Sequence, residues 1–185
     1  MSFNTLLAIE AGVLVLAMLL AWLFGLALWA QMEWSLATLN MGVLATLPLV
    51  LLAIRSDRMR ADWVEGLRSV VDDMLLPALR QAPPGGLVLL AILAGVGEEW
   101  LFRGVIQGGV SELLSPNVAL VIAALLFGLA HAVSVAYFLA ATVAGLYLGL
   151  LYQWSGNLLL PILVHSLYDY VICLYLLRRP AAPNP

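Results

Sequence analysis

The chain has 185 residues, of which 64% are hydrophobic and 10% are charged, and its mean hydropathy is +1.03. Soluble globular domains carry about 25% charged residues, so this composition excludes that class. The net charge of −3, with no clustered basic stripe, also excludes nucleic acid as a partner. We therefore expect a polytopic membrane protein whose surroundings are the lipid bilayer.

The hydrophobic runs predict about six transmembrane helices, because one crossing of a ~30 Å hydrocarbon core takes about 20 residues. The predicted fold class is thus all-α, with a single transmembrane helical domain over residues 1–179 and a motif-bearing core at 87–177. We expect residues 180–185 to be a disordered tail. The predicted spans are 6–30, 36–54, 87–109, 117–131, 135–152 and 158–177.

Between the second and third spans, residues 56–82 predict an amphipathic helix that lies in the membrane interface. Apolar residues such as Trp63, Leu67 and Val71 recur at helical spacing, and acidic and basic residues fill the other face. A helix that packs on the bundle from the aqueous side is the alternative interpretation. Pro83-Pro84 and Gly85-Gly86 end this segment and precede the third span.

The arginines outside the spans predict the orientation of the chain. They lie at 55–80 and at 178–179, and an even number of predicted crossings separates the two groups. Cytoplasmic loops carry an excess of Lys and Arg, so we expect both termini to be cytoplasmic. The expected location is a prokaryotic inner (plasma) membrane.

The third span contains three charged residues, Glu98, Glu99 and Arg103. Each costs about 2.5–3.5 kcal/mol at the centre of a membrane helix, so they must be paired, hydrated or functional. Glu99 and Arg103 are four residues apart with the acid first, which favours an ion pair. Glu98 points about 100° away and is left to face a cavity, where a carboxylate can act as a general base on water.

The chain's two histidines, His131 and His165, lie in or at the end of predicted spans. His165 and Asp169 are four residues apart on one face of the sixth span, and Phe127 has the same relation to His131 on the fourth. We interpret Phe127 as a packing residue. Three helices thus place ionisable groups within a few turns of one another.

Three motifs occur in order on successive apolar segments: EEWLFR (98–103), FGLAH (127–131) and HSLYD (165–169). Together they resemble the pattern E-E-x-x-x-R, F-x-x-x-H and H-x-x-x-N or D of the type II CAAX prenyl endopeptidase-like family of intramembrane proteases, also called CPBP or Abi. The resemblance implies endopeptidase activity on a membrane-tethered peptide or protein. The motifs cover residues 98–169, about two fifths of the chain.

The resemblance also implies roles for the motif residues. Glu98 would activate the water that His131 holds, and His165 with Asp169 would orient the scissile carbonyl and stabilise its oxyanion. Glu99 and Arg103 are similar to the family's supporting pair. Asp169 stands where the eukaryotic prenyl-protein enzymes have Asn. Of everything that the resemblance implies, prenylated substrates therefore have the least support from these residues.

Members of the family have been described as metalloproteases. The same residues also suit a glutamate protease that works without a metal. Glu98, His131 and His165 would make an acceptable three-ligand zinc site. We favour no cofactor, because the chain lacks the H-E-x-x-H motif that places two histidines on one helix. Zinc remains the alternative cofactor.

Two other functions are compatible with intramembrane Glu, His and Asp. A proton-coupled transporter subunit would use them as a relay, but it predicts inverted repeats, and the first two spans carry almost no polar residues. A non-catalytic immunity or scaffold protein of the same fold would bind a peptide without cutting it. The sequence carries no signal for the oligomeric state or the identity of the substrate.

Overall fold

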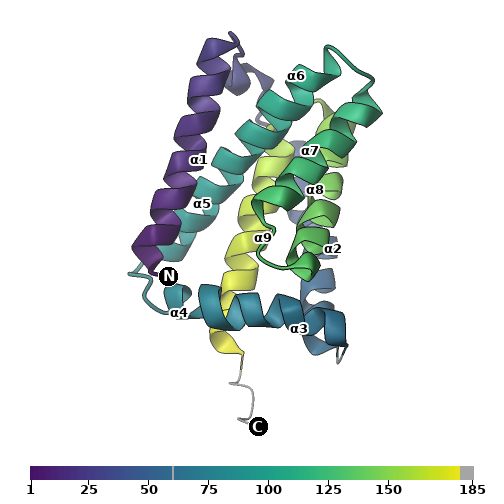
Figure 1. Cartoon of the computed structure of the whole chain (residues 1–185). Coiled ribbons are helices and arrows are strands. Elements are labelled where there is room, and N and C mark those ends of the chain that lie inside the picture. Colours follow the sequence, from purple (N-terminus) through teal and green to yellow (C-terminus); the bar gives the residue numbers. More distant parts are fainter. Residues whose placement is uncertain (60, 180–185) are drawn as a thin grey trace.

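The computed structural model describes residues 1–59 and 61–179, with Asp62 and Trp63 described by their backbone alone. Arg60, the side chain of Trp63 and the predicted tail at 180–185 therefore lie outside the described residues. The described part of the chain is a bundle of helices without a strand (Figure 1), which confirms the predicted all-α membrane class.

Four helices in the described part are long and apolar enough to cross a membrane. They are α1 (Phe3–Leu23), α2 (Leu36–Arg58), α8 (Val135–Ser155) and α9 (Leu159–Arg178). The predicted third span is a continuous rod of α5 (Gly86–Glu99), the π-helical η3 (Trp100–Gln107) and α6 (Gly108–Ser111). The predicted fourth span is α7 (Pro116–Ala130), which at 15 residues is shorter than a full crossing.

The first predicted span is too long. Helix α1 ends at Leu23 because Gly25 adopts a left-handed φ of 67°, and the 3-10 helix η1 (Leu28–Gln31) follows. Helix α2 begins where predicted but continues to Arg58, beyond the predicted end at residue 54. Its start is fixed by Ser35, whose hydroxyl accepts a hydrogen bond from the backbone N–H of Thr38 at 3.0 Å.

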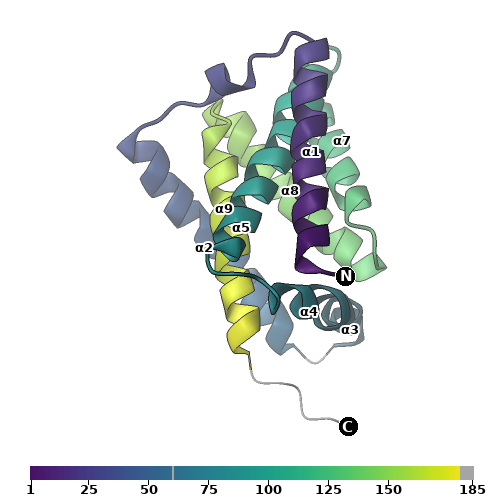
Figure 2. The ribbon, with the colours of Figure 1, turned by 90° about the vertical axis from the view of Figure 1, so that its left-hand side faces the viewer.

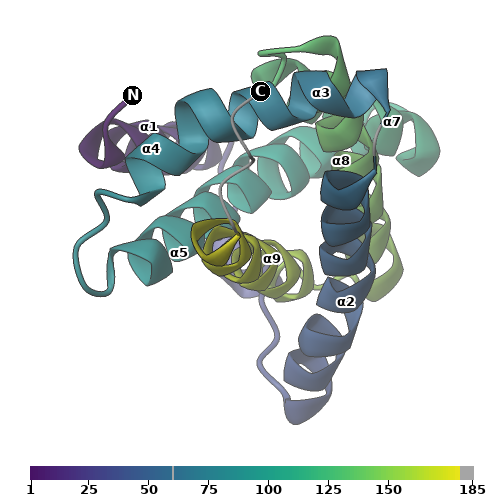
Figure 3. The same ribbon diagram turned by 90° about the horizontal axis from the view of Figure 1, so that it is seen from below.

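A transverse helix runs across one side of one end of the bundle (Figures 1 and 3). It consists of α3 (Asp62–Ser69), η2 (Val70–Leu75, π-helical) and α4 (Leu76–Leu79). Its buried apolar face packs on the ends of α1, α5 and α9. The residues of this cluster are Phe3, Leu6, Leu76, Ala78, Leu79, Leu90 and Leu176. The N-terminus and the last turn of α9 lie at this same end (Figure 1).

Helix α9 lies inside the bundle, between α5 and α2 (Figure 2). Buried Asn157 fixes the connection that leads into it. Its side-chain amide donates to the carbonyl of Glu33 at 2.9 Å, and its side-chain oxygen accepts from the N–H groups of Glu33 and Leu159, each at 3.0 Å. The long connection from α1 to α2 is thereby attached to the start of α9.

Glycines let α8 approach its neighbours closely. A Cβ atom on Gly149 would lie 2.5 Å from Leu120 Cδ1 of α7 and 2.7 Å from Gln107 Oε1 of η3. Small residues at membrane helix interfaces commonly serve this purpose. The close packing matters for the site, because it brings the backbone carbonyls of α8 to the polar side chains of η3.

Candidate active site

The two acids of the EEWLFR motif stand at a change in helix geometry. Glu98 and Glu99 are the last residues of α5, and the π-helical segment η3 begins with the next residue, Trp100. Both carboxyl groups are buried inside the bundle. Wide π-helical turns within α-helices occur frequently at functional sites.

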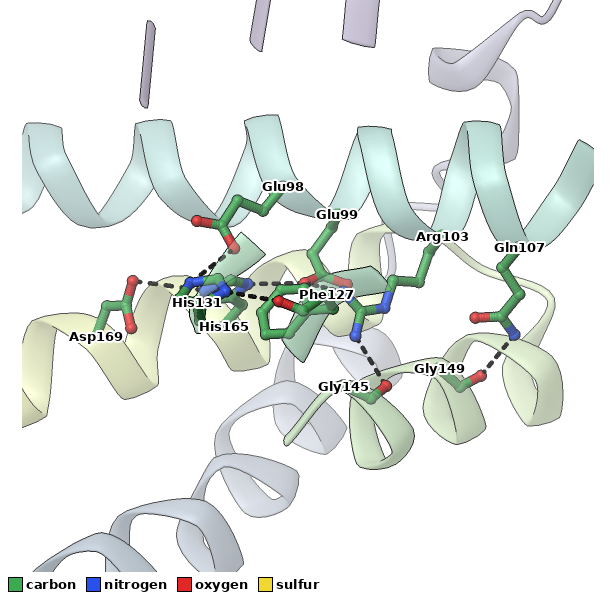
Figure 4. Close-up of polar contacts among 10 residues, drawn as sticks. All are labelled: Glu98, Glu99, Arg103, Gln107, Phe127, His131, Gly145, Gly149, His165 and Asp169. Atoms are coloured by element: carbon green, nitrogen blue, oxygen red, sulfur yellow. Dashed lines mark hydrogen bonds and ion pairs between the residues drawn. The ribbon is translucent and has the colours of Figure 1, made fainter. Parts of the chain in front are cut away.

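The predicted ion pair between Glu99 and Arg103 is present and fully buried. Arg103 Nη1 donates to Glu99 Oε1 at 3.0 Å, and the two side chains are 0% and 1% exposed. Arg103 Nη2 donates to the carbonyl of Gly145 in α8 at 2.8 Å, and the guanidinium lies 4.7 Å from the ring centroid of Phe127. Figure 4 shows Gln107, one turn on, reaching the carbonyl of Gly149 in the same way at 3.0 Å. The guanidinium of Arg103 is thus contacted by the Glu99 carboxylate, the Gly145 carbonyl and the Phe127 ring.

Glu99 does more than neutralise Arg103. The same oxygen, Oε1, lies 2.7 Å from Nδ1 of His165, while Nε2 of that ring faces Asp169 Oδ2 at 3.5 Å. A doubly protonated imidazole donates from both nitrogens, so this arrangement offers a carboxylate to each. Sequence spacing linked His165 to Asp169 but missed its contact with Glu99, which comes from another helix.

His131 caps the C-terminal end of α7 and faces Glu98. Its Nδ1 lies 2.8 Å from the carbonyl oxygen of Phe127, and its ring stacks on the Phe127 ring with centroids 4.7 Å apart. Because a carbonyl only accepts, we assign the proton to Nδ1, which leaves Nε2 to face Glu98 Oε2 at 3.7 Å. Phe127, interpreted from the sequence as packing, therefore also orients the histidine.

The four predicted catalytic side chains line one cavity of about 250 Å³. Figure 4 shows that Glu98, His131, His165 and Asp169 come from three elements, α5, the end of α7, and α9. The cavity continues along apolar side chains toward the transverse helix, with Asp57 and Arg68 in its wall. The structure thus brings together the residues that the sequence placed on separate spans.

The cavity also contains a carboxyl group that the sequence analysis missed. Glu10 of α1 lines it, and so do Tyr137, Tyr168 and Cys173. The sequence does contain a signal for Glu10, because it is a single acid inside an apolar run. The same feature marks Glu98 as a candidate functional residue. The interpretation that the first two spans contribute almost no polar residues is therefore wrong for the site.

Residues 80–171 match the family model for type II CAAX prenyl endopeptidase Rce1-like proteins. This part of the chain is similar to the Rce1-like family. The matched residues contain all three motifs, and the family that they match is one of CAAX-type intramembrane endopeptidases. The resemblance inferred from the motifs is thus confirmed.

One curated relative of this chain is an uncharacterized protein of Bacillus subtilis (strain 168), YpbD. The two are 33% identical over 88 residues, which is 46% of this chain and 42% of the relative. The match therefore spans less than half the length of that protein. No solved structure matches the chain.

The site does not gather the three zinc ligands that the sequence allowed. Among the described residues, no three His, Cys, Asp or Glu side chains converge on a point where one ion would bind. Both ring nitrogens of His165 face carboxylates of Glu99 and Asp169, so neither is turned toward Glu98 and His131 as a ligand. The arrangement of these Rce1-like residues does not fit a three-ligand zinc centre.

Proposed function

We propose that the chain is an intramembrane endopeptidase that hydrolyses a peptide bond of a membrane-associated protein or peptide, with Glu98 as the base that activates water. The observation that carries the proposal is the environment of Glu98. Its Oε2 is buried without a hydrogen-bond partner among the described residues, lies 3.7 Å from His131 Nε2, and borders the cavity. A buried acceptor left free in this way is rare unless it serves a function.

The distance between Glu98 and His131 suits a shared water molecule. At 3.7 Å the two groups are too far apart for a direct hydrogen bond, and a water beside them can contact both. Glu98 takes one proton from this water, and the resulting hydroxide attacks the scissile carbonyl carbon. His131 orients the water through Nε2, while its Nδ1 is held by the carbonyl of Phe127.

In this proposal His165 stabilises the oxyanion. Its Nε2 is 3.5 Å from Asp169, a long contact that leaves the N–H able to donate to a substrate oxygen. Glu99 holds Nδ1, and Asp169 keeps the ring oriented. When the C–N bond of the tetrahedral intermediate breaks, the leaving amine takes the proton that Glu98 received, which restores the enzyme.

The cavity gives the substrate a route to these groups. It leads from Glu98 past apolar residues of α1 and α9 to the transverse helix, whose arginine Arg68 borders it. We place this end of the bundle on the cytoplasmic side of a prokaryotic inner membrane, because the described arginines outside the site gather there, at Arg55, Arg58, Arg68, Arg80, Arg178 and Arg179. The substrate would enter from the cytoplasmic interface.

The test is cleavage of membrane-tethered reporter peptides by the purified protein in detergent, with products identified by mass spectrometry. We expect Glu98→Gln to lower the turnover rate by about 10²–10⁴-fold, because an amide cannot accept the proton of water. Glu33→Gln makes the same chemical change at an exposed acid outside the cavity and should leave cleavage unchanged. Equal activity of wild type and Glu98→Gln would contradict the assigned base. Binding of the reporter without cleavage by wild type would instead indicate a scaffold function.

The same assay tests the absence of a metal from the mechanism. We expect exhaustive chelation, followed by dialysis, to leave the cleavage rate unchanged, because the ligands do not converge. Loss of activity on chelation and its recovery with added zinc would overturn the metal-free mechanism. Proton flux in liposomes that requires Glu98, without cleavage, would favour a transporter.

A further inference from the structure

Of the four predicted catalytic residues, His131 alone stands where the chain leaves a helix, at the end of α7. Its side chain is 25% exposed, and its Nδ1 is bonded to the carbonyl of Phe127. A single hydrogen bond leaves the plane of the imidazole free to tilt. Catalytic groups keep a productive geometry only when packing also locks their rotamers, so His131 needs contacts on its ring faces.

Two aromatic rings supply those contacts. The Phe127 ring stacks on the imidazole with centroids 4.7 Å apart, and the ring of Tyr137 in α8 lies 5.9 Å away; each makes an angle of 30° with the imidazole plane. Aromatic pairs attract each other at centroid distances of about 4.5–7 Å. Phe127 and Tyr137 make no aromatic contact with each other in the described part of the chain, so they approach His131 from different sides.

Tyr137 is itself fixed, because the first turn of α8 is capped and docked on the transverse helix (Figure 1). Ser134 Oγ accepts a hydrogen bond from the backbone N–H of Tyr137 at 3.1 Å and donates to the carbonyl of Gly66 in α3 at 3.2 Å. A Cβ atom on Gly66 would lie 3.6 Å from Ala136 Cβ, an ordinary contact distance. The transverse helix thus holds the turn that carries Tyr137.

The Tyr137 ring also borders the cavity, beside Glu98 and His131. A smaller aliphatic side chain at this position would leave space next to the imidazole, and the ring of His131 could turn into it. Nε2 of His131 would then leave its place 3.7 Å from Glu98 Oε2.

We propose that Tyr137 is a positioning residue, whose ring holds the His131 imidazole so that Nε2 stays directed at Glu98 and at the water that they share. This inference rests on the proposed function, because it deepens the role of His131. Tyr137 acts through His131 and need not touch the substrate. Ser134 keeps the ring in place, so the orientation of a catalytic group depends on a contact with the transverse helix.

Two substitutions separate the ring of Tyr137 from its hydroxyl. Tyr137→Phe keeps the ring and should retain turnover within about threefold of wild type. Tyr137→Leu removes the ring and should lower kcat by about 10–100-fold with KM nearly unchanged, because the histidine is displaced and the substrate contacts are not. Phe138→Leu is the matched control: it removes a ring from the next residue of α8, which does not line the cavity, and should leave turnover unchanged.

A second pair of substitutions tests the link to the transverse helix. Ser134→Ala keeps the Tyr137 ring but removes the helix cap and the contact with Gly66, and should lower kcat by a smaller factor than Tyr137→Leu. Ser35 caps α2 in the same way, at 3.0 Å from the N–H of Thr38, and lies outside the cavity. Ser35→Ala should therefore leave kcat unchanged. Equal kcat in wild type and Ser134→Ala would overturn the role given to the transverse helix.

Nuclear magnetic resonance of isotope-labelled histidine gives a readout that does not depend on activity. The chain has two histidines, so two ring signals are expected, and His131→Asn identifies the signal of His131. Tyr137→Leu should broaden this signal, because the imidazole then samples several orientations, and Tyr137→Phe should preserve it. The His165 signal shows whether each variant is folded. Tyr137→Met takes the place of Tyr137→Leu if that variant does not fold.

Loss of kcat together with a broadened His131 signal in Tyr137→Leu, both rescued in Tyr137→Phe, supports the proposal. Full turnover or an unchanged His131 signal in Tyr137→Leu would overturn it, and so would a Phe variant as impaired as the Leu variant. If wild type cleaves no reporter, the proposed function fails, while the signal still reports whether Tyr137 restrains His131.

Discussion

Two clusters of polar and charged residues, each with members in the wall of the same cavity, differ in how they are held. The buried cluster consists of Glu98, Glu99, Arg103, His165 and Asp169. The mouth cluster, next to the transverse helix, consists of Asp57, Arg68, Asp72, Tyr175 and Arg179. Glu99 and Arg103 are 0% and 1% exposed, whereas Asp72 in the mouth cluster is 36% exposed.

The mouth cluster joins three elements through ionic contacts. Arg179 at the end of α9 binds both Asp57 of α2 and Asp72 of η2, and Tyr175 donates to Asp57 at 2.8 Å. Partial burial disfavours the charged form of Arg179, but Asp57 and Asp72 outweigh this and raise the pKa of the guanidinium. Arg68 donates to the carbonyls of Asp57 and Met59, which ties α3 to the end of α2.

This difference in burial means that ion pairs of similar composition can have different effects on stability and catalysis. In the buried cluster the Glu99–Arg103 pair has few, fixed partners and no solvent to replace one that is lost. In the mouth cluster, water and dissolved ions can replace a partner that is lost. We therefore expect substitutions in the buried cluster to change stability and catalysis together, and those in the mouth cluster to have smaller effects that depend on salt.

The largest effect on stability is expected from breaking the buried pair. Arg103→Met leaves Glu99 with His165 as its one remaining side-chain partner and should lower the free energy of unfolding by about 3–5 kcal/mol. Glu99→Leu combined with Arg103→Met removes both charges and should recover much of this loss. Equilibrium unfolding in mixed micelles measures both. A double variant no more stable than the single one would show that the two residues do not act as a unit.

A smaller effect is expected from separating the helices that hold His165 and Glu99. A Cβ atom on Gly95 of α5 would overlap Ser166 Oγ and lie 2.9 Å from the Ser166 backbone nitrogen of α9. Gly95→Ala should cost about 1–3 kcal/mol of stability, and a displacement of α9 of about 1 Å should lower turnover by about 10²-fold.

Gly109→Ala is the matched control for this substitution, because nothing lies within 4 Å of its Cβ position. It should leave turnover unchanged and stabilise α6 by up to about 1 kcal/mol, the difference in helix propensity. Equal losses in the two alanine variants would contradict the argument from close approach. Unfolding and reporter cleavage are measured side by side.

The smallest effect is expected in the mouth cluster. Asp72→Asn should lower the free energy of unfolding by about 0–1 kcal/mol, as for exposed ion pairs, and the difference should shrink as salt is added. The cost of Arg103→Met should show no such dependence, because its surroundings exclude ions. A salt-independent loss of several kcal/mol from Asp72→Asn would show that the two clusters are held in the same way.

Much of the fold follows from local patterns in the sequence. The spans at 87–109, 135–152 and 158–177 lie within a few residues of the observed helices, because apolar runs and glycine or proline breaks act locally. The end of α1 was placed too late, because an apolar run continues past Gly25, whose left-handed backbone ends the helix. The π-helical geometry of η3 left no signal, since its composition is that of an ordinary helix.

The sequence by itself determined the membrane class, the pairing of Glu99 with Arg103, and the set of motif residues on three spans. These follow from composition and from i,i+4 spacing, which are properties of single helices. Only the tertiary structure decided that Glu99 also holds His165, that His131 faces Glu98, and that Glu10 joins them. The physical reason is that contacts between helices depend on how closely their backbones approach, and Gly95 and Gly97 set that distance in three dimensions.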